Sequence, residues 1–198
     1  MTGDHHDADD PWPRLRRWLA PGGALAQTLM LATATPGGAP SLRVVALRGL
    51  DDRGLHVFTH GGSRKVRELE RNGRFAAALH FDPHPEGGHR QLRLEGAIEW
   101  MPRDRVERYF ATRPRAAQLS AAVSRQGEPS PGVAALRAAQ AALDDALGPA
   151  AVPCPADFVG LVLLPAVIEF WRGASDRLHE RWVHRREGAT WRAEALQP

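Results

Sequence analysis

The sequence is short of cysteine and lysine, and each shortage limits what the protein can be. Cys154 is the only cysteine in 198 residues, so an internal disulfide and a zinc site built from CxxC pairs are both excluded. Lys65 is the only lysine, and all the other cationic residues in the total of 26 are arginine. A lone lysine in so arginine-rich a chain is a first, weak indication of a specific role.

Long apolar runs and blocks of one charge are also missing. No run is long enough to span a bilayer, and residues 1–10 are polar and acidic, without the apolar centre of a signal peptide. The net charge is +3 and basic residues alternate with acidic ones, which disfavours nucleic-acid binding. We therefore expect a cytoplasmic protein that contacts neither membrane nor nucleic acid.

Signatures of metal and hydrolase sites are missing as well. The histidines at His5, His6, His84 and His89 have no partners at the spacing of metal ligands, so no metal is expected. No GxSxG sequence occurs, which leaves a serine hydrolase unsupported.

What is present predicts one domain at residues 11–198, after a disordered tail at 1–10. Successive strands with short turns favour an antiparallel arrangement, and helices outside it complete a mainly β (α+β) fold, an antiparallel β-barrel. Strands are predicted at 28–35, 41–48, 55–60, 75–81, 91–100, 158–164, 167–171 and 177–184, with a short one near Trp191. Helices are predicted between Pro13 and Pro21, at 64–72 with Ser63 as N-cap, at 102–113, at 114–125 and from Val133 to Gly148, with a helical turn at 24–27.

The most informative stretch follows the apolar run 161–168. Trp171 ends this run, and Arg177, His179 and Arg181 then occur at spacing two. On a strand these three side chains share one face. Guanidinium groups bind phosphate or carboxylate, imidazole moves protons, and indole packs on rings, so the face suits an anionic aromatic ligand. A solvated basic strand with a core tryptophan is an equally good interpretation of these residues alone.

A second candidate site is a phosphate site around the start of helix 64–72. Arg64 and Lys65 follow the glycines at 61 and 62, and Arg43 lies on a neighbouring predicted strand. A helix N-terminus and nearby cations bind anions. Gln91 heads the polar face of its strand, where an amide could pair with a polar ring edge. An exposed helix start and a solvent-facing glutamine are the alternatives.

A third group could enclose a small phosphorylated ring. Tyr109 and Arg113 are four residues apart on a predicted helix and therefore share a face. Arg177 and His179 would complete the enclosure. Core packing of Tyr109 and a helix end at Arg113 are the alternatives.

Several motifs, in their order along the chain, together resemble one family. They are SLRVVALRG (41–49), VFTHGGSRKVRELERN (57–72), RQLRLEG (90–96), YFATRPRAAQLSAAVSRQ (109–126), IEFWRG (168–173) and RLHERW (177–182). Between about residue 11 and residue 198 the chain resembles the pyridoxine/pyridoxamine 5'-phosphate oxidases. The resemblance implies an FMN-binding split β-barrel that forms a homodimer with cofactor sites between the subunits.

The resemblance also implies an activity and a set of residues. The implied reaction moves a hydride from the substrate to N5 of FMN; oxygen then reoxidises the flavin, which gives hydrogen peroxide and pyridoxal 5'-phosphate. The residues expected to bind FMN are Arg43, Val44, Val45, Ala46, Leu47, Arg48, Phe58, Thr59, Arg64, Lys65, Gln91, Gln126, Trp171 and Arg181. The residues expected to bind substrate are Arg48, Tyr109, Arg113, Arg177 and His179, of which Arg177 and His179 are the expected catalytic pair.

The chain departs from the family pattern mainly where the substrate phosphate would bind. Arg48 stands where the family usually has lysine, and Ala117 and Gly127 stand where it has serine. Residues 158–162 also differ from the usual pattern, and the loop at 82–89 is longer. The alternatives are therefore a related flavin oxidase of the phenazine-biosynthesis type, a non-enzymatic FMN-binding barrel and, with little support, a nucleic-acid-binding barrel.

Overall fold

The computed structural model describes residues 10–20, 28–84 and 88–198, so the expected helical turn at 24–27 and nearly all of the expected tail lie outside the described residues. Its helices are α1 (Trp12–Leu19), α2 (Arg64–Asn72), α3 (Arg103–Ala111), α4 (Arg115–Val123) and α5 (Val133–Leu147). Its strands are β1 (Thr28–Ala34), β2 (Pro40–Ala46), β3 (Gly49–Leu50), β4 (Leu55–His60), β5 (Arg74–Phe81), β6 (Arg90–Trp100), β7 (Phe158–Arg172), β8 (Glu180–Glu187) and β9 (Thr190–Leu196).

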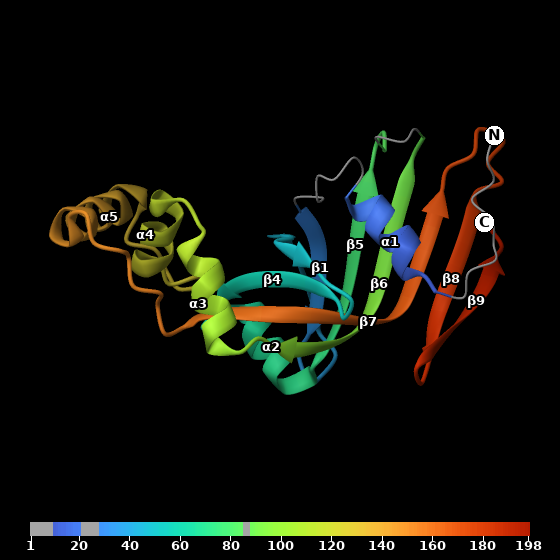
Figure 1. The fold of residues 1–198 in the computed structure, drawn as a ribbon, viewed down its shortest axis with the longest axis horizontal. Coiled ribbons are helices and arrows are strands. Elements are labelled where there is room, and N and C mark those ends of the chain that lie inside the picture. Colours follow the sequence, from blue (N-terminus) through green and yellow to red (C-terminus); the bar gives the residue numbers. More distant parts are fainter. Residues whose placement is uncertain (1–9, 21–27, 85–87) are drawn as a thin grey trace.

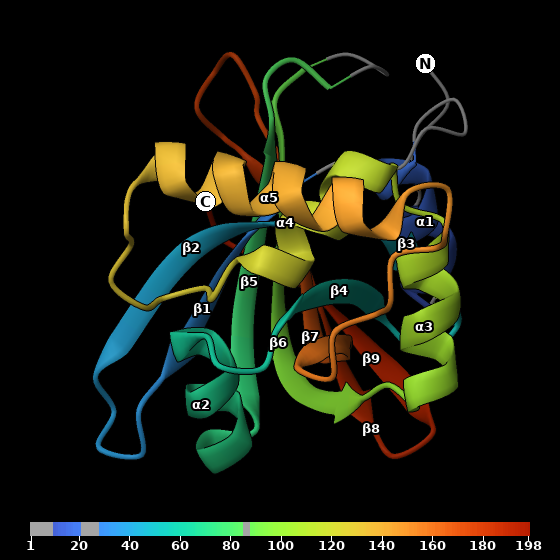
Figure 2. The same ribbon diagram turned by 90° about the vertical axis from the view of Figure 1, so that its left-hand side faces the viewer.

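One antiparallel sheet organises the described chain. Seven strands follow the order β2-β1-β5-β6-β7-β4-β3, and β8 and β9 continue from β7. The sheet curls into a half-barrel, which is most visible when the molecule is turned end-on (Figure 2). The predicted class, mainly β and antiparallel with helices outside the barrel, is confirmed.

Strand β7 connects the two ends of the molecule. It pairs with β6, β4 and β8, and it runs as one element through the position where the sequence predicted a break at Pro165. The prediction of two strands was wrong because a β-bulge absorbs the proline: Gly96 opposes Pro165, Glu95 opposes Val167, and Ala166 is left as the extra residue. A proline, which has no N–H to donate, is tolerated in a strand at such a bulge.

The core lies inside the curled sheet and is closed at one side by α1. Leu15, Trp18 and Leu19 of this helix are fully buried, as the predicted helical spacing requires. The Trp18 ring meets the Phe170 ring edge-on, with centroids 5.2 Å apart. A second apolar cluster around Phe110 and Phe158 fixes α3 on the sheet.

The predicted strand at 177–184 begins three residues later than expected. Strand β8 starts at Glu180, and Arg177 and His179 belong to the loop before it. Arg177 has a φ of 68°, in the left-handed region that an arginine rarely adopts. The spacing-two argument for Arg177, His179 and Arg181 was therefore wrong, because the first two are not on a strand.

Helices α3, α4 and α5 lie at one end of the molecule, and β8 and β9 lie at the other (Figure 1). No residue of α5 is fully buried and Val133 at its start is 62% exposed, but Leu143 and Leu147 of the predicted apolar stripe are half-buried and pack against the second cluster. Among the described residues, no helix has the length and apolar character needed to cross a membrane.

Candidate functional site

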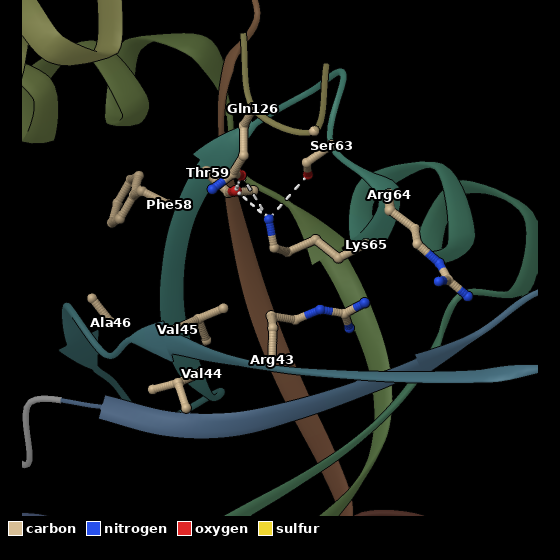
Figure 3. Close-up of a pocket in the computed structure, with 11 residues that line it drawn as sticks. Arg43, Val44, Val45, Ala46, Phe58, Thr59, Ser63, Arg64, Lys65 and Gln126 are labelled. Atoms are coloured by element: carbon tan, nitrogen blue, oxygen red, sulfur yellow. Dashed lines mark hydrogen bonds between the residues drawn. The ribbon is translucent and has the colours of Figure 1, made fainter. Parts of the chain in front are cut away.

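Nine of the expected FMN-binding residues line one cavity of about 410 Å³. Strands β2 and β4 form its floor, the start of α2 forms one wall, and the loop after α4 brings Gln126 from across the pocket (Figure 3). We call this cavity the phosphate pocket. Its expected residues are Arg43, Val44, Val45, Ala46, Phe58, Thr59, Arg64, Lys65 and Gln126, and Ser63 and Gly127 line it too.

Lys65 is the electrostatic centre of the phosphate pocket. Its side chain is 6% exposed, and its ammonium group donates to Thr59 Oγ1 (2.9 Å), Ser63 Oγ (3.1 Å) and Gln126 Oε1 (2.8 Å) (Figure 3). All three acceptors are neutral, and among the described residues no carboxylate pairs with it. Burial and then the nearby Arg43 lower the pKa of Lys65 to about 8. An anion in this pocket would supply the missing countercharge.

A buried carboxylate organises the two arginines beside Lys65. Glu68 is 4% exposed and accepts from Ser41 Oγ, Thr33 Oγ1 and Arg64 Nε. Burial would raise the pKa of Glu68, but these hydrogen bonds outweigh it and lower the pKa to about 2. Arg43 lies 3.5 Å from the same carboxylate and also donates to Thr33 Oγ1 (2.7 Å). Glu68 therefore neutralises part of the charge of Arg43 and Arg64 but leaves that of Lys65 uncompensated.

Ser63 occupies the N-cap position of α2, as the sequence predicted, but its side chain makes no capping hydrogen bond. Its hydroxyl oxygen accepts from Lys65 instead. The residue at the helix start therefore serves the phosphate pocket.

Arg48, Tyr109 and Arg113 form a second group, next to the phosphate pocket. Tyr109 stacks on Phe58, which lines that pocket, with ring centroids 3.6 Å apart and planes 13° from parallel. The Arg113 guanidinium lies 5.0 Å from the centre of the Phe158 ring. Burial lowers the pKa of Arg113, and the positive charge of Arg48 lowers it further. The sequence predicted Tyr109 and Arg113 on one helix, but Arg113 falls just beyond the end of α3.

Arg113 also has an unused hydrogen-bond donor. Its Nη1 atom is buried, and within the described chain it has no hydrogen-bond partner. A buried donor without an acceptor is costly. The cationic pair of Arg48 and Arg113 is therefore ready to accept an anionic group.

Trp171, Arg177 and His179 line a separate cavity of about 590 Å³, which we call the tryptophan pocket. The rings of Trp171 and His179 lie 4.8 Å apart between centroids. His179 Nδ1 accepts the N–H of Ala174 (3.1 Å), so Nε2 is the atom that can carry the proton. The loop before β8 thus brings Arg177 and His179 beside Trp171, although not by the strand geometry that was predicted.

Gln91, Trp171 and Arg181 lie in one row across β6, β7 and β8. Gln91 opposes Trp171, and Trp171 opposes Arg181. Directly opposed residues of antiparallel strands have their side chains on the same face. Arg181 also donates to Glu169 Oε1 (2.9 Å), which fixes its guanidinium on this face.

The structure does not unite all the expected residues within one chain. The phosphate pocket and the tryptophan pocket share no lining residue. Leu47 lies in the core, 2% exposed, and only its backbone could face a ligand. The residues that sequence reasoning missed as part of the site are Glu68, Thr33 and Ser41, which hold the arginines in place. Glu68 follows Arg64 by four residues on α2, and this spacing was the one available signal for the pair.

The class of the protein is a flavin-dependent oxidoreductase, which fits the antiparallel split half-barrel, the buried lysine without a described counterion and the tryptophan pocket. The comparisons identify its family. Residues 22–144 match the family described as "Pyridoxamine 5'-phosphate oxidase", and residues 158–198 match "Pyridoxine 5'-phosphate oxidase C-terminal dimerisation region". The chain belongs to the pyridoxine/pyridoxamine 5'-phosphate oxidase family. This confirms the resemblance inferred from the motifs.

Individual relatives agree with this assignment. The pyridoxine/pyridoxamine 5'-phosphate oxidase of Rubrobacter xylanophilus is 40% identical over 100% of this chain and 92% of its own. The pyridoxine-5'-phosphate oxidase of Bos taurus is 38% identical over 81% of this chain and 60% of its own. PhzG from Burkholderia lata, solved in complex with tetrahydrophenazine-1-carboxylic acid, is 34% identical and covers 100% of this chain and 98% of its own, with a TM-score of 0.88.

The lowered pKa of Lys65 predicts an unusual dependence of stability on pH. The pKa falls from 10.5 to about 8 on folding, so between these values the unfolded chain binds more protons and stability rises with pH. Relative to the Lys65→Met variant, the ligand-free protein should gain on the order of 3 kcal/mol between pH 7 and pH 10.5, at 1.36 kcal/mol per pKa unit.

Urea unfolding of both proteins at a series of pH values measures this difference. The comparison with Lys65→Met removes the contributions of all other titrating groups. If the free energy of unfolding changed with pH equally in the two proteins, the prediction of a lowered Lys65 pKa would be contradicted.

Proposed function

We propose that the protein is an FMN-dependent oxidase of pyridoxine and pyridoxamine 5'-phosphate. The observation that carries the proposal is the buried ammonium of Lys65, which is surrounded by neutral acceptors and Arg43 and has no described carboxylate partner. A terminal phosphate supplies the charge that this pocket lacks, and FMN ends in such a group. Family membership supports a flavin as the cofactor.

The residues of the phosphate pocket fit FMN in chemistry and in position. Lys65, Arg43 and Ser63 would hold the phosphate at the positive end of the α2 dipole. In the ligand-free pocket Lys65 donates to Thr59 and Gln126. Once Lys65 binds the phosphate instead, the Thr59 hydroxyl and the Gln126 amide would be free to form hydrogen bonds with the ligand. FMN, when bound, supplies the hydride acceptor; the protein supplies position and charge.

A second subunit would complete the site. In one chain the phosphate pocket and the tryptophan pocket are separate cavities, and the chain carries the family's C-terminal dimerisation region at 158–198. We infer a homodimer in which Gln91, Trp171 and Arg181 of one subunit meet the phosphate pocket of the other. The exposed apolar side chains of Met30, Val44 and Leu42 on the β1–β2 face would then be covered.

The substrate would be held by the remaining expected residues. Arg48, Tyr109 and Arg113 would bind its phosphate, since the free Nη1 of Arg113 needs an acceptor. Arg48 can form two parallel hydrogen bonds where the usual lysine offers a point charge. Arg177 and His179 would orient the ring, with the proton on His179 Nε2 available to a polar ring substituent.

A related oxidase that acts on a larger ring is the second candidate function. PhzG, whose complex contains a tricyclic carboxylic acid, matches this chain along its whole length. Ala117 in place of the usual serine removes one hydrogen bond to a substrate phosphate, which fits a substrate without one. The third candidate function is binding of FMN without enzymatic activity.

Anaerobic reduction of the bound flavin tests these functions directly. Pyridoxamine and pyridoxine 5'-phosphate should each bleach the flavin absorbance of the purified protein, and the bleached protein should recover its colour in air. Bleaching by a dihydrophenazine carboxylate alone would instead establish the second candidate. A flavin that no candidate substrate reduces would leave a binding protein.

The phosphate assignment predicts selective loss of FMN affinity in Lys65→Met. The variant should bind FMN about 10- to 100-fold more weakly, because a hydrogen bond to a charged group contributes about 1.5–3 kcal/mol. Riboflavin, which lacks the phosphate, should bind both proteins equally. Arg67→Met, which removes an exposed cation from the same helix, is the matched control. Flavin fluorescence titration measures the affinity of each protein for FMN and for riboflavin, and an unchanged FMN affinity in Lys65→Met would refute the assignment.

The shared site predicts that Lys65→Met, assayed at an FMN concentration too low to load it, and Arg177→Ala restore each other's activity. Lys65→Met and Arg177→Ala lie in different pockets, so a mixed dimer has one site with both defects and one with neither. Unfolding and refolding the two inactive proteins together should recover about a quarter of the wild-type activity, since half of randomly formed dimers are mixed and each has one intact site. Activity that stays at the level of the separate variants would contradict a site built from two chains.

A further inference from the structure

The row of site residues across the sheet has a fourth member, His80. On β5, His80 opposes Gln91, which opposes Trp171 on β7. The strands β5, β6, β7 and β8 lie side by side (Figure 1). Leu79 and Phe75 are on the buried face of β5, and His80 is on the opposite, exposed face. There it lines the tryptophan pocket. Its imidazole therefore shares the face that the flavin-binding row is expected to use.

His89 brings a second imidazole to the same pocket. It precedes Gln91 by two positions and lies beside Gly173, whose N–H donates to the His89 carbonyl (2.9 Å). A Cβ on Gly173 would lie 3.1 Å from the Trp171 ring and 3.2 Å from Cβ of His89, so the glycine keeps the space between them open. His89 Nδ1 pairs with Asp82 Oδ1 (2.7 Å), so Nδ1 carries a proton, and Nε2 can donate to an anionic ligand when the ring is the doubly protonated imidazolium.

The chemistry of the lining favours an anion. Three imidazoles and the Arg177 guanidinium line the pocket, and none of its described lining residues is a carboxylate. Among the described residues no three histidine, cysteine or acidic side chains are grouped to hold a metal ion. His179 Nε2 and Arg177 are donors, His80 can donate from either ring nitrogen, and His89 becomes a second-side donor as the imidazolium, so a flat ring on Trp171 would meet donors at its edge.

We propose that His80 and His89, with Arg177, form a subsite for a carboxylate carried by an aromatic ring in the tryptophan pocket. The inference rests on the proposed function, because Arg177 and His179, which would orient the substrate ring, line this pocket. A carboxylate is favoured over a phosphate because Arg48 and Arg113, with its buried free donor, already offer a phosphate site elsewhere. The chain would thus accept ring acids as substrates or as inhibitors.

Matched ligand pairs on the flavin-loaded protein test the subsite. Phenazine-1-carboxylate and its neutral carboxamide differ at the group in question, and each can be titrated by its effect on flavin absorbance. Wild type should bind the carboxylate at least about tenfold more tightly than the carboxamide. The His80→Leu/His89→Leu double variant should lose this preference, and its affinity for the carboxamide should stay the same.

Two controls keep the outcome specific. Arg74→Leu removes a cation from the same face of β5 at its far end, and it should leave the preference intact. Pyridoxamine 5'-phosphate and pyridoxamine form a second ligand pair, and the preference for the phosphate should survive in the double variant.

Equal binding of carboxylate and carboxamide by wild type, or a preference unchanged by the double substitution, would overturn the subsite. Loss of the phosphate preference would show that these imidazoles bind phosphate instead. Flavin reduction by pyridoxamine 5'-phosphate, measured on the same samples, reports separately on the proposed function.

Discussion

The site depends on one unbalanced charge, the buried ammonium of Lys65. The fold holds this group with three neutral oxygens and places Arg43 nearby, so the ligand-free pocket carries an excess of positive charge. Glu68 could have neutralised it, but its oxygens are already engaged by Ser41, Thr33 and Arg64. The carboxylate thus positions the arginines, and the charge of Lys65 keeps no counterion among the described residues.

Strand β7 links this pocket to the rest of the chemistry. It runs from Phe158, whose ring centre lies 5.0 Å from the Arg113 guanidinium, to Trp171 in the tryptophan pocket, and it pairs with β4, which carries Phe58 and Thr59 of the phosphate pocket. The bulge at Ala166 accommodates Pro165, which has no N–H to donate, and it lets the strand bend with the curled sheet. The two pockets share no lining residue, and the proposed homodimer would bring them together without any change in the fold.

Predictions from sequence succeeded where the signal was local. The alternation of Leu92 and Leu94 with polar residues predicted β6, and the spacing of Leu15, Trp18 and Leu19 predicted α1. Arg64 and Lys65 line one cavity with Ser63 for the same reason, since the three residues are consecutive; their role in binding phosphate stays a prediction. The strand proposed for Arg177 and His179 failed, because alternating residue types do not reveal a left-handed backbone or a loop.

The sequence by itself determined the antiparallel class, most element bounds and the candidate residues, because periodicity and turn residues act over a few positions. The tertiary structure alone decided that Glu68 is buried among hydroxyl groups, that Arg113 keeps a free donor, and that His80 stands in line with Gln91 and Trp171. These facts arise from the register between strands that are far apart in sequence. Register is set by the burial of a whole sheet face, and no short stretch of residues encodes it.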